Sequence, residues 1–428
     1  MPSALAPHHT TSLAAFLKSI KHDEIDSAIE LFVSLLQRRQ IKSSRPCALA
    51  TAHLLLRVIA AERYKNAQAL IKRIKSVGRK LVAAQPREMA VGNIVRRVLG
   101  IVREIAEDEL NTALAPSVTD PLPVATTSTS SPPSLSPQVT SLFGIFQNPT
   151  GVSVAAGAPI GVSQPSTKTK HSPGEKKEKI DAKAEIIEGI KELLDELDVV
   201  DTQIAETALD HIHSNEIILT HTSSQTVQRF LAAAARKRKF TLIHAEAYPN
   251  DHHATHTTVV NGNKKSNSEA DEEDERWKPL TQMGITVILV PDSAVFALMS
   301  RINKVILAPH TVLADGSLIA AAGAAAVAQA ANVHRVPVVV LSGVYKLSPV
   351  YPFDTSELIE YGDPGNVIDY SDGEFVDKVD VMNPLFDHVG ADNVDLYITN
   401  LGAHAPSYLY RIVADHYRTE DIDLSIDN

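Results

Sequence analysis

The 428-residue sequence contains one cysteine, Cys47, which excludes an internal disulfide and any zinc site built from several cysteines. It also lacks an apolar run approaching the roughly 20 residues that cross a bilayer. Its amino terminus has no basic segment followed by an apolar one, the pattern that directs secretion. Together these absences predict a protein of a reducing compartment, the cytoplasm, with no membrane partner.

Signature motifs for cofactors and nucleic acids are missing as well. No glycine-rich dinucleotide fingerprint and no phosphate-loop sequence is present. No basic stretch is interleaved with aromatic residues in the manner of RNA-binding surfaces, and the net charge of −10 opposes RNA binding. We therefore expect no cofactor and no direct nucleic-acid contact.

The centre of the sequence, residues 284–343, carries the pattern of a parallel sheet. The apolar run Ile285–Val290 is short and rich in β-branched residues, which predicts a strand covered on both faces. Asp292 or Ser293 is expected to cap a helix through Ile302. After the apolar run 305–307, an Ala-rich helix is predicted from Ser317 to about Ala331, with Gly323 inside it for close packing, followed by a strand at 336–341. Strands and helices alternating at this spacing predict a doubly wound α/β fold.

The rest of the chain divides by composition. Residues 1–112 show helical periodicity after a tail of about 12 residues and predict an all-helical domain. Residues 113–179 are rich in Ser, Thr, Pro and Gly and are expected to be a disordered linker or insert. A connecting helix is predicted over 180–215, with a break near Val199. Residues 216–428 complete a Rossmann-like parallel-sheet domain with strands at 216–220, 240–244 and finally 396–399, and a disordered insert at about 250–276.

Candidate site residues follow the expected strands, because ligands of open parallel sheets bind beyond the carboxyl ends of the strands. Ser223 and Ser224 precede a helix and are either an anion site or ordinary helix caps, and the second interpretation is favoured. His310 is either an acid–base group or a structural histidine, and again the structural interpretation is favoured. No metal site is expected, since His252, His253 and His256 in the insert are better explained as a solvated loop.

Charge is distributed unevenly along the chain. Residues 57–104 carry 12 Lys or Arg against 3 Glu, whereas residues 354–428 carry 17 acidic residues against 3 basic ones. The densest basic cluster consists of Lys72, Arg73, Lys75, Arg79 and Lys80. Several of these must share one helix face, which is either a solvated surface or a binding face for an anionic partner.

Several long stretches resemble the family of regulatory subunits of eukaryotic translation initiation factor 2B, which comprises alpha, beta and delta subunits. The resemblance is to the beta type. The stretches are PREMAVGNIVRRVLGIVREI (86–105), HSNEIILTHTSSQTV (213–227), KRKFTLIHAEAYP (237–249), GITVILVPDSAVFALMSRINKVILAPHTVLADGSLIAAAGA (284–324) and YKLSPVYPFD (345–354). The resemblance covers nearly everything outside the two low-complexity segments. It implies a helical domain followed by a Rossmann-like domain.

The same resemblance extends to sugar-phosphate isomerases such as methylthioribose-1-phosphate isomerase, so an aldose–ketose isomerase is the alternative function. Those enzymes carry a catalytic cysteine where this sequence has Thr222, and an aspartate where it has His310. Their Asn-Lys pair corresponds to Ala320 and Ala321. Because a threonine hydroxyl is far less ionised than a thiol, these departures favour a non-enzyme.

The resemblance therefore implies a non-catalytic regulatory subunit of the guanine nucleotide exchange factor for initiation factor 2. The implied partners are the alpha, delta, gamma and epsilon subunits, and initiation factor 2 through its alpha subunit. We expect the α/β domain to hold the obligate subunit interface. The basic cluster is the candidate face for sensing the phosphorylated alpha subunit of initiation factor 2.

Overall fold

The computed structural model describes residues 13–61, 64, 66–114, 182–222, 224–246, 277–351, 354–368 and 378–424, with side chains at 109–114 excepted. The stretches predicted to be a disordered linker, a histidine-containing insert and an amino-terminal tail lie outside these residues, as does Ser223. The described residues up to Ala113 and from Ala182 onward belong to one compact unit.

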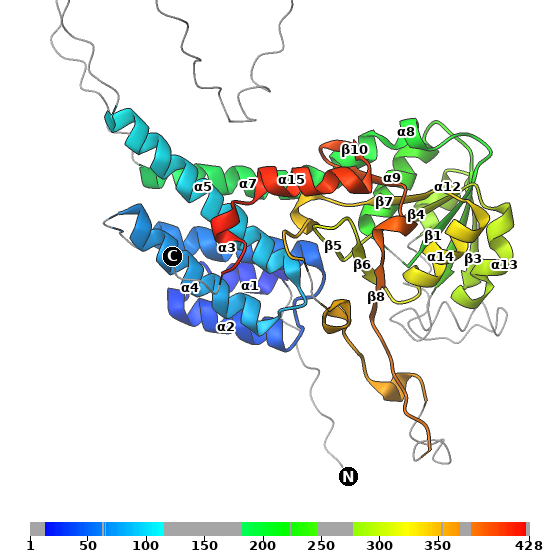
Figure 1. Ribbon diagram of the computed structural model, residues 1–428, viewed down its shortest axis with the longest axis horizontal. Helices are drawn as coiled ribbons and strands as arrows, with labels where there is room; N and C mark the ends of the chain where they lie inside the picture. The colour runs from blue at the N-terminus through cyan, green and yellow to red at the C-terminus, as the bar shows by residue number, and fades with distance from the viewer. Residues whose placement is uncertain are drawn as a thin grey trace, which may run out of the picture. The chain divides into compact units, whose positions relative to one another are not determined.

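The amino-terminal part is helical, as predicted. Its five helices are α1 (Leu13–Ser19), α2 (Ile25–Gln37), α3 (Ser44–Ala61), α4 (Ala67–Ala84) and α5 (Met89–Leu114) (Figure 1). Each helix buries the residues that recur at helical spacing; Ile29, Phe32 and Leu36 of α2, for example, are at most 2% exposed. Phe32 stacks on Phe16 of α1 with ring centroids 4.9 Å apart. This regular apolar stripe is why the helices were readable in the sequence.

Helix α7 (Ala182–Glu206) leads into the sheet and is followed by the short helix α8 (Ala208–His211). The prediction of a break near Val199 was wrong, because α7 continues through this residue and ends at Glu206. Val199 is 44% exposed, whereas Val200 and Ile204 continue the buried stripe of the helix. The helix is interrupted at Thr207 instead, shortly after Ile204, the last buried residue of α7.

A seven-stranded sheet in the order β10-β9-β7-β4-β1-β2-β3 forms the second part. All neighbouring strands are parallel except the pair β9 and β10. The strands are β1 (Ile217–His221), β2 (Thr241–Glu246), β3 (Thr286–Pro291), β4 (Lys304–Leu307), β7 (Val338–Leu341), β9 (Leu396–Thr399) and β10 (Gly402–His404). The predicted Rossmann-like class is confirmed. The prediction that 396–399 is the last strand was wrong, since β10 pairs with it across a two-residue turn.

Helices cover both faces of this sheet. Ile218 of β1 belongs to the apolar cluster that contains α7 and α9 (Gln225–Ala235), whereas Leu219, the next residue, belongs to the cluster with α14 (Ala324–His334) and α15 (Leu409–His416). This opposition follows from the period of two along a strand. The first cluster also contains the buried residues of α2 to α5. The helical part and one face of the sheet therefore share a single core.

Two predictions in the central stretch were wrong. Residues Leu318–Ala321 form strand β6 of a three-stranded antiparallel sheet with β5 (Thr311–Val312) and β8 (Phe386–Val389), so the Ala-rich helix begins at Ala324 and not at Ser317. Gly323 lies at the start of that helix with φ of +98°, a conformation that favours glycine. It does not stand inside the helix. Strand β5 was not predicted, and β8 is distant along the chain. Pairing with these two strands overrides the helix propensity of alanine.

Strand β3 was predicted to be covered on both faces, and this was also wrong. It is the edge strand of the sheet, and Ile288 is 43% exposed. The turn after it forms short helical segments, η2 (Asp292–Ala294), α13 (Val295–Leu298) and η3 (Met299–Arg301), in place of one regular helix. An edge position could not be predicted, because Ile285–Val290 is as apolar as a central strand.

The remaining short elements are α12 (Lys278–Gln282) and the 3₁₀ turns η4 (Val344–Lys346), η5 (Thr355–Leu358), η6 (Pro364–Asn366), η7 (Ala391–Asn393), η8 (Pro406–Tyr408) and η9 (Thr419–Asp421). The acidic carboxyl-terminal stretch contains α15 and η9, and Asp421 is 1% exposed. No helix among the described residues is long and apolar enough to cross a membrane.

Candidate functional site

A cavity of about 580 Å³ lies at the carboxyl ends of β1, β4 and β7 and is closed by the beginning of α3. It brings together four of the residues singled out in the sequence: Thr222, Ser224, His310 and Ala321. Ala320 is buried in β6 and does not line the cavity. The basic cluster of α4 contributes no residue to it.

Thr222 terminates β1 in a left-handed conformation, with φ of 55°. Its amide donates to the carbonyl of Ala245 at 3.1 Å, which continues the ladder between β1 and β2 by one residue. Ser224 is the first residue before α9, in extended backbone, but its side chain makes no capping hydrogen bond. Ser224 therefore occupies the N-cap position of α9, although its hydroxyl does not bond to the first turn of the helix. Its position at the cavity wall keeps it available to a ligand.

Cationic side chains dominate the polar part of the cavity wall. They are Arg45 at the start of α3, Arg229 on α9, and Lys346 after β7. The facing carboxylate is Asp201 of α7, whose Oδ2 lies 2.5 Å from Nη1 of Arg45 and 3.5 Å from Nη1 of Arg229. Thr226 donates its hydroxyl to the other oxygen of Asp201 at 2.8 Å. One carboxylate thus faces two guanidinium groups and an ammonium group, and the cavity carries a net positive charge.

Lys346 is held against the backbone, with Nζ donating to the carbonyl of Pro309 at 2.9 Å. Burial lowers the pKa of this lysine, while Asp201 and Glu88 oppose the change by attraction. The ammonium group and the carbonyl belong to the loops that follow β7 and β4. This contact therefore fixes one side of the cavity.

His310 joins the helical part to the sheet. Its Nε2 lies 3.3 Å from Oε2 of Glu88, and Ser44 donates its hydroxyl to the His310 carbonyl at 2.8 Å. The ring stacks on Phe386 with centroids 4.6 Å apart. Burial lowers the pKa of His310 to about 3, helped by the nearby charges of Lys346 and Arg39, and burial raises the pKa of Glu88 to about 7. The lowered pKa keeps His310 neutral at physiological pH, and its structural role stays a prediction.

The arrangement lacks the reactive groups of an aldose–ketose isomerase at the expected positions. Thr222 offers a hydroxyl in place of a thiol, His310 is neutral and packed, and Ala321 has no polar atom. The single thiol, Cys47, is 1% exposed in α3, and burial raises its pKa further. Among the described residues, no three His, Cys, Asp or Glu side chains gather in a way that holds a metal ion.

Sequence reasoning missed Arg45, Asp201, Arg229 and Lys346. One signal was present: Asp201 stands at a helical spacing that places it among Leu197, Val200 and Ile204, and a carboxylate on an apolar stripe requires a partner. Arg45 and Lys346 gave no comparable signal, since nothing local distinguishes them from surface cations. Their convergence depends on contacts between the start of α3 and the loop after β7.

Comparison with known proteins identifies the family. The model of the initiation factor 2 subunit family matches residues 40–266 and 272–406. The chain belongs to that family. It is 37% identical over 415 residues to translation initiation factor eIF2B subunit beta of Schizosaccharomyces pombe, covering 95% of this chain and 99% of the relative. The corresponding subunit of Dictyostelium discoideum is 36% identical and covers 92% of this chain and 96% of the relative.

Solved structures agree with this membership. The crystal structure of eIF2B beta from Chaetomium thermophilum superposes with a TM-score of 0.62 at 29% identity, covering 96% of this chain and 97% of that one. The tetrameric eIF2B-beta2-delta2 complex of the same organism gives 0.63 at 29% identity, over 95% of this chain and 100% of that one. A ribose 1,5-bisphosphate isomerase of Archaeoglobus fulgidus is 34% identical, but over only 34% of this chain and 48% of the enzyme.

Proposed function

We propose that this chain is the beta-type regulatory subunit of the guanine nucleotide exchange factor for initiation factor 2, and that it works by assembly in the cytoplasm. The observation that carries the proposal is the likeness to eIF2B beta subunits along 95% of the chain. The loss of thiol and carboxylate at Thr222 and His310 supports a non-catalytic role. The proposed partners are the delta, alpha, gamma and epsilon subunits.

The surface supports an interface on the α/β part. Among the described residues, twelve large apolar side chains are exposed, and eleven of them lie in residues 216–428; the exception is Val199. Tyr351 and Met382 are 66% and 69% exposed, and Phe296 and Val333 are 57% and 69% exposed. Exposed aromatic and methionine side chains are enriched at the centres of protein interfaces. We assign the contact with a delta-type subunit to this part of the chain.

Native mass spectrometry of the chain co-expressed with its delta-type partner tests the assembly. Deleting residues 1–112 is a poor test, because the helices share a core with the sheet and the deletion would expose it. Two double variants are compared, Tyr351→Ser with Met382→Ser and Phe296→Ser with Val333→Ser. At least one of them should bind the delta-type partner at least tenfold more weakly than the wild-type chain. The matched control is Val199→Ser on α7. Full binding by both double variants would refute the assignment.

We further propose that the cavity binds a small anion without converting it. Arg45, Arg229 and Lys346 supply the attraction. Thr222 and Ala321, at the positions where the isomerases carry reactive groups, have no group that could convert the anion. Inorganic phosphate and ribose 5-phosphate should raise the melting temperature, and no ketose should form from the sugar phosphate. Turnover that Thr222→Ala abolishes would establish the isomerase alternative instead.

A further inference from the structure

A buried basic site lies on the helical part, away from the cavity. It consists of Lys75 on α4 and of Arg96 and Arg103 on α5. The two arginines are seven residues apart, two helical turns, so they project from the same face of α5. The side chains of Lys75 and Arg103 are 4% and 15% exposed, and Arg96 as a residue is 8% exposed.

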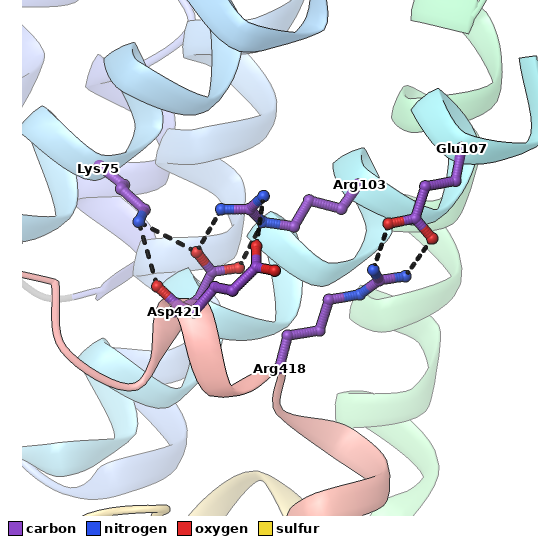
Figure 2. A network of polar contacts seen from close by, with 6 residues as sticks. Lys75, Arg103, Glu107, Arg418 and Asp421 are labelled. Carbon is purple, nitrogen blue, oxygen red and sulfur yellow. Dashed lines mark hydrogen bonds and ion pairs between the residues drawn. The ribbon is translucent and has the colours of Figure 1, made fainter. Parts of the chain in front are cut away.

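The occupant of this basic site is the acidic turn that follows α15, residues 418–422. Asp421 accepts hydrogen bonds from Arg103 through both carboxylate oxygens, at 2.9 Å from Nε and 3.0 Å from Nη2. Nζ of Lys75 lies 3.2 Å from Oδ1 of the same carboxylate. Figure 2 shows Lys75 and Arg103 pointing at Asp421 from opposite sides. The contact with Asp421 raises the pKa of the Arg103 guanidinium.

Backbone carbonyls of the turn complete the site. The carbonyl of Glu420 accepts from Nζ of Lys75 at 3.3 Å. That of Ile422 accepts from Nε and Nη2 of Arg96 at 3.1 and 2.9 Å. Beside them, Arg418 makes two bonds with Glu107 of α5, at 2.5 and 3.1 Å (Figure 2). The site therefore recognises an acidic peptide in a 3₁₀ turn, by its carboxylate and by the two carbonyl groups that flank the acidic residue.

Burial explains why the site needs an occupant. Removing one partner of a buried ion pair leaves an uncompensated charge, which costs more than the pair contributes. Asp421 is the only carboxylate that the described structure places in bonding contact with both Lys75 and Arg103. Without the turn, these cations would have to attract another anion or rearrange.

We infer that Lys75, Arg96 and Arg103 form a receptor for an acidic peptide and that this receptor is occupied in cis by residues 418–422. Two consequences follow. The turn ties the end of the α/β part to α4 and α5. It also removes the most buried cation of the predicted basic cluster, Lys75, from the surface that partners can reach, so an anionic partner must displace the turn to contact it.

The test uses the full-length chain and a fluorescent peptide of residues 415–424. The peptide should bind the Asp421→Asn chain at least tenfold more tightly than the wild-type chain, because the substituted turn competes weakly for the site. The same peptide carrying Asp421→Asn should lose this binding. Asp415→Asn, an exposed change on α15, is the matched control and should leave the peptide excluded.

Amide hydrogen exchange of the same chains supplies an independent measurement. Asp421→Asn should accelerate exchange in α4, α5 and residues 418–424 by at least tenfold and leave the central strands β1 and β4 unchanged. Equal peptide binding by wild-type and Asp421→Asn chains would overturn the inference. So would faster exchange that extends equally into the central strands, or exchange that does not change at all.

Discussion

Glu88 and His310 approach each other to 3.3 Å across the boundary between the helical part and the sheet, and burial disfavours the charged form of both. The carboxyl group precedes α5, and the imidazole follows β4. The pair is therefore least costly to bury when both groups are neutral, His310 as the imidazole and Glu88 as the carboxylic acid. The stability of the packing between the helical part and the sheet therefore depends on pH.

Glu88→Gln should change the pH dependence of stability. The pKa of Glu88 rises from 4.5 to about 7 on folding, so the native state binds more protons between these values and its stability falls as pH rises through that window. At about 1.4 kcal/mol per pH unit, the loss is on the order of 3 kcal/mol. Glutamine cannot ionise, so the free energy of unfolding of the variant should rise relative to that of wild type by this amount as the pH increases from 4.5 to 7. Parallel urea-unfolding curves for the two proteins would contradict the assignment, and Glu357→Gln, an exposed site, is the control.

Asp201→Asn should destabilise the fold and strengthen anion binding together. The carboxylate is 4% exposed and is the counter-charge of Arg45 and Arg229, so its loss should cost about 3 kcal/mol. Inorganic phosphate should then bind more tightly, since one negative charge has left the cavity wall. Asp198→Asn, at a side chain that is 67% exposed, should do neither. Phosphate titration by calorimetry and urea unfolding measure the two effects, and a drop in phosphate affinity would exclude the cavity as an anion site.

Gly323→Ala should destabilise the protein by about 2 kcal/mol or more, because its φ of +98° is unfavourable for alanine. The added Cβ would also lie 2.8 Å from Nε2 of His221, which is buried. Gly100→Ala is the matched control: it lies in α5 with nothing within 4 Å of the new Cβ, so it should stabilise by up to about 1 kcal/mol. Thermal unfolding of both variants measures the contrast. Equal melting temperatures would show that the turn before α14 tolerates a side chain.

Reversing every charge of the basic cluster on α4 would also break ion pairs within the fold, so only some of its cations should be substituted. Arg73 and Lys80 pair with Asp26 and Glu30 of α2 at 2.7 and 2.9 Å, and Lys75 is buried against Asp421. Lys72 is exposed. Its reversal together with Lys80→Glu tests long-range attraction without disturbing the buried ion pair.

Lys72→Glu with Lys80→Glu should weaken binding of phosphorylated initiation factor 2 about threefold more than binding of the unphosphorylated form. The effect is measured at about 0.1 M salt, where the screening length is about 10 Å. Lys378→Glu reverses one charge, half the change of the double variant, at an exposed site of the α/β part and should have no selective effect. If both forms bind the double variant as they bind wild type, this face does not sense phosphorylation.

The sequence by itself determined the elements whose signal is local. Helices α2 to α5 and α7 follow from apolar residues at a spacing of three and four, and β1, β2, β4, β7 and β9 follow from short β-branched runs. Thr222 and His310 were placed at the strand ends because parallel strands have their carboxyl ends at one edge. The family membership was also legible, because its motifs are contiguous.

Tertiary structure alone decided what depends on pairing between distant segments. Leu318–Ala321 became a strand because β5 and β8 pair with it, and β3 became an edge because no strand among the described residues pairs with its outer side. Arg45, Asp201 and Lys346 come from three segments, each more than 140 residues from the next along the chain, and local periodicity carries no information about such convergence. Asp421 lies in the most acidic part of the sequence, and nothing local distinguishes it from its acidic neighbours. Lys75 and Arg103 bury it, because a charge enters the interior only where opposite charges meet it.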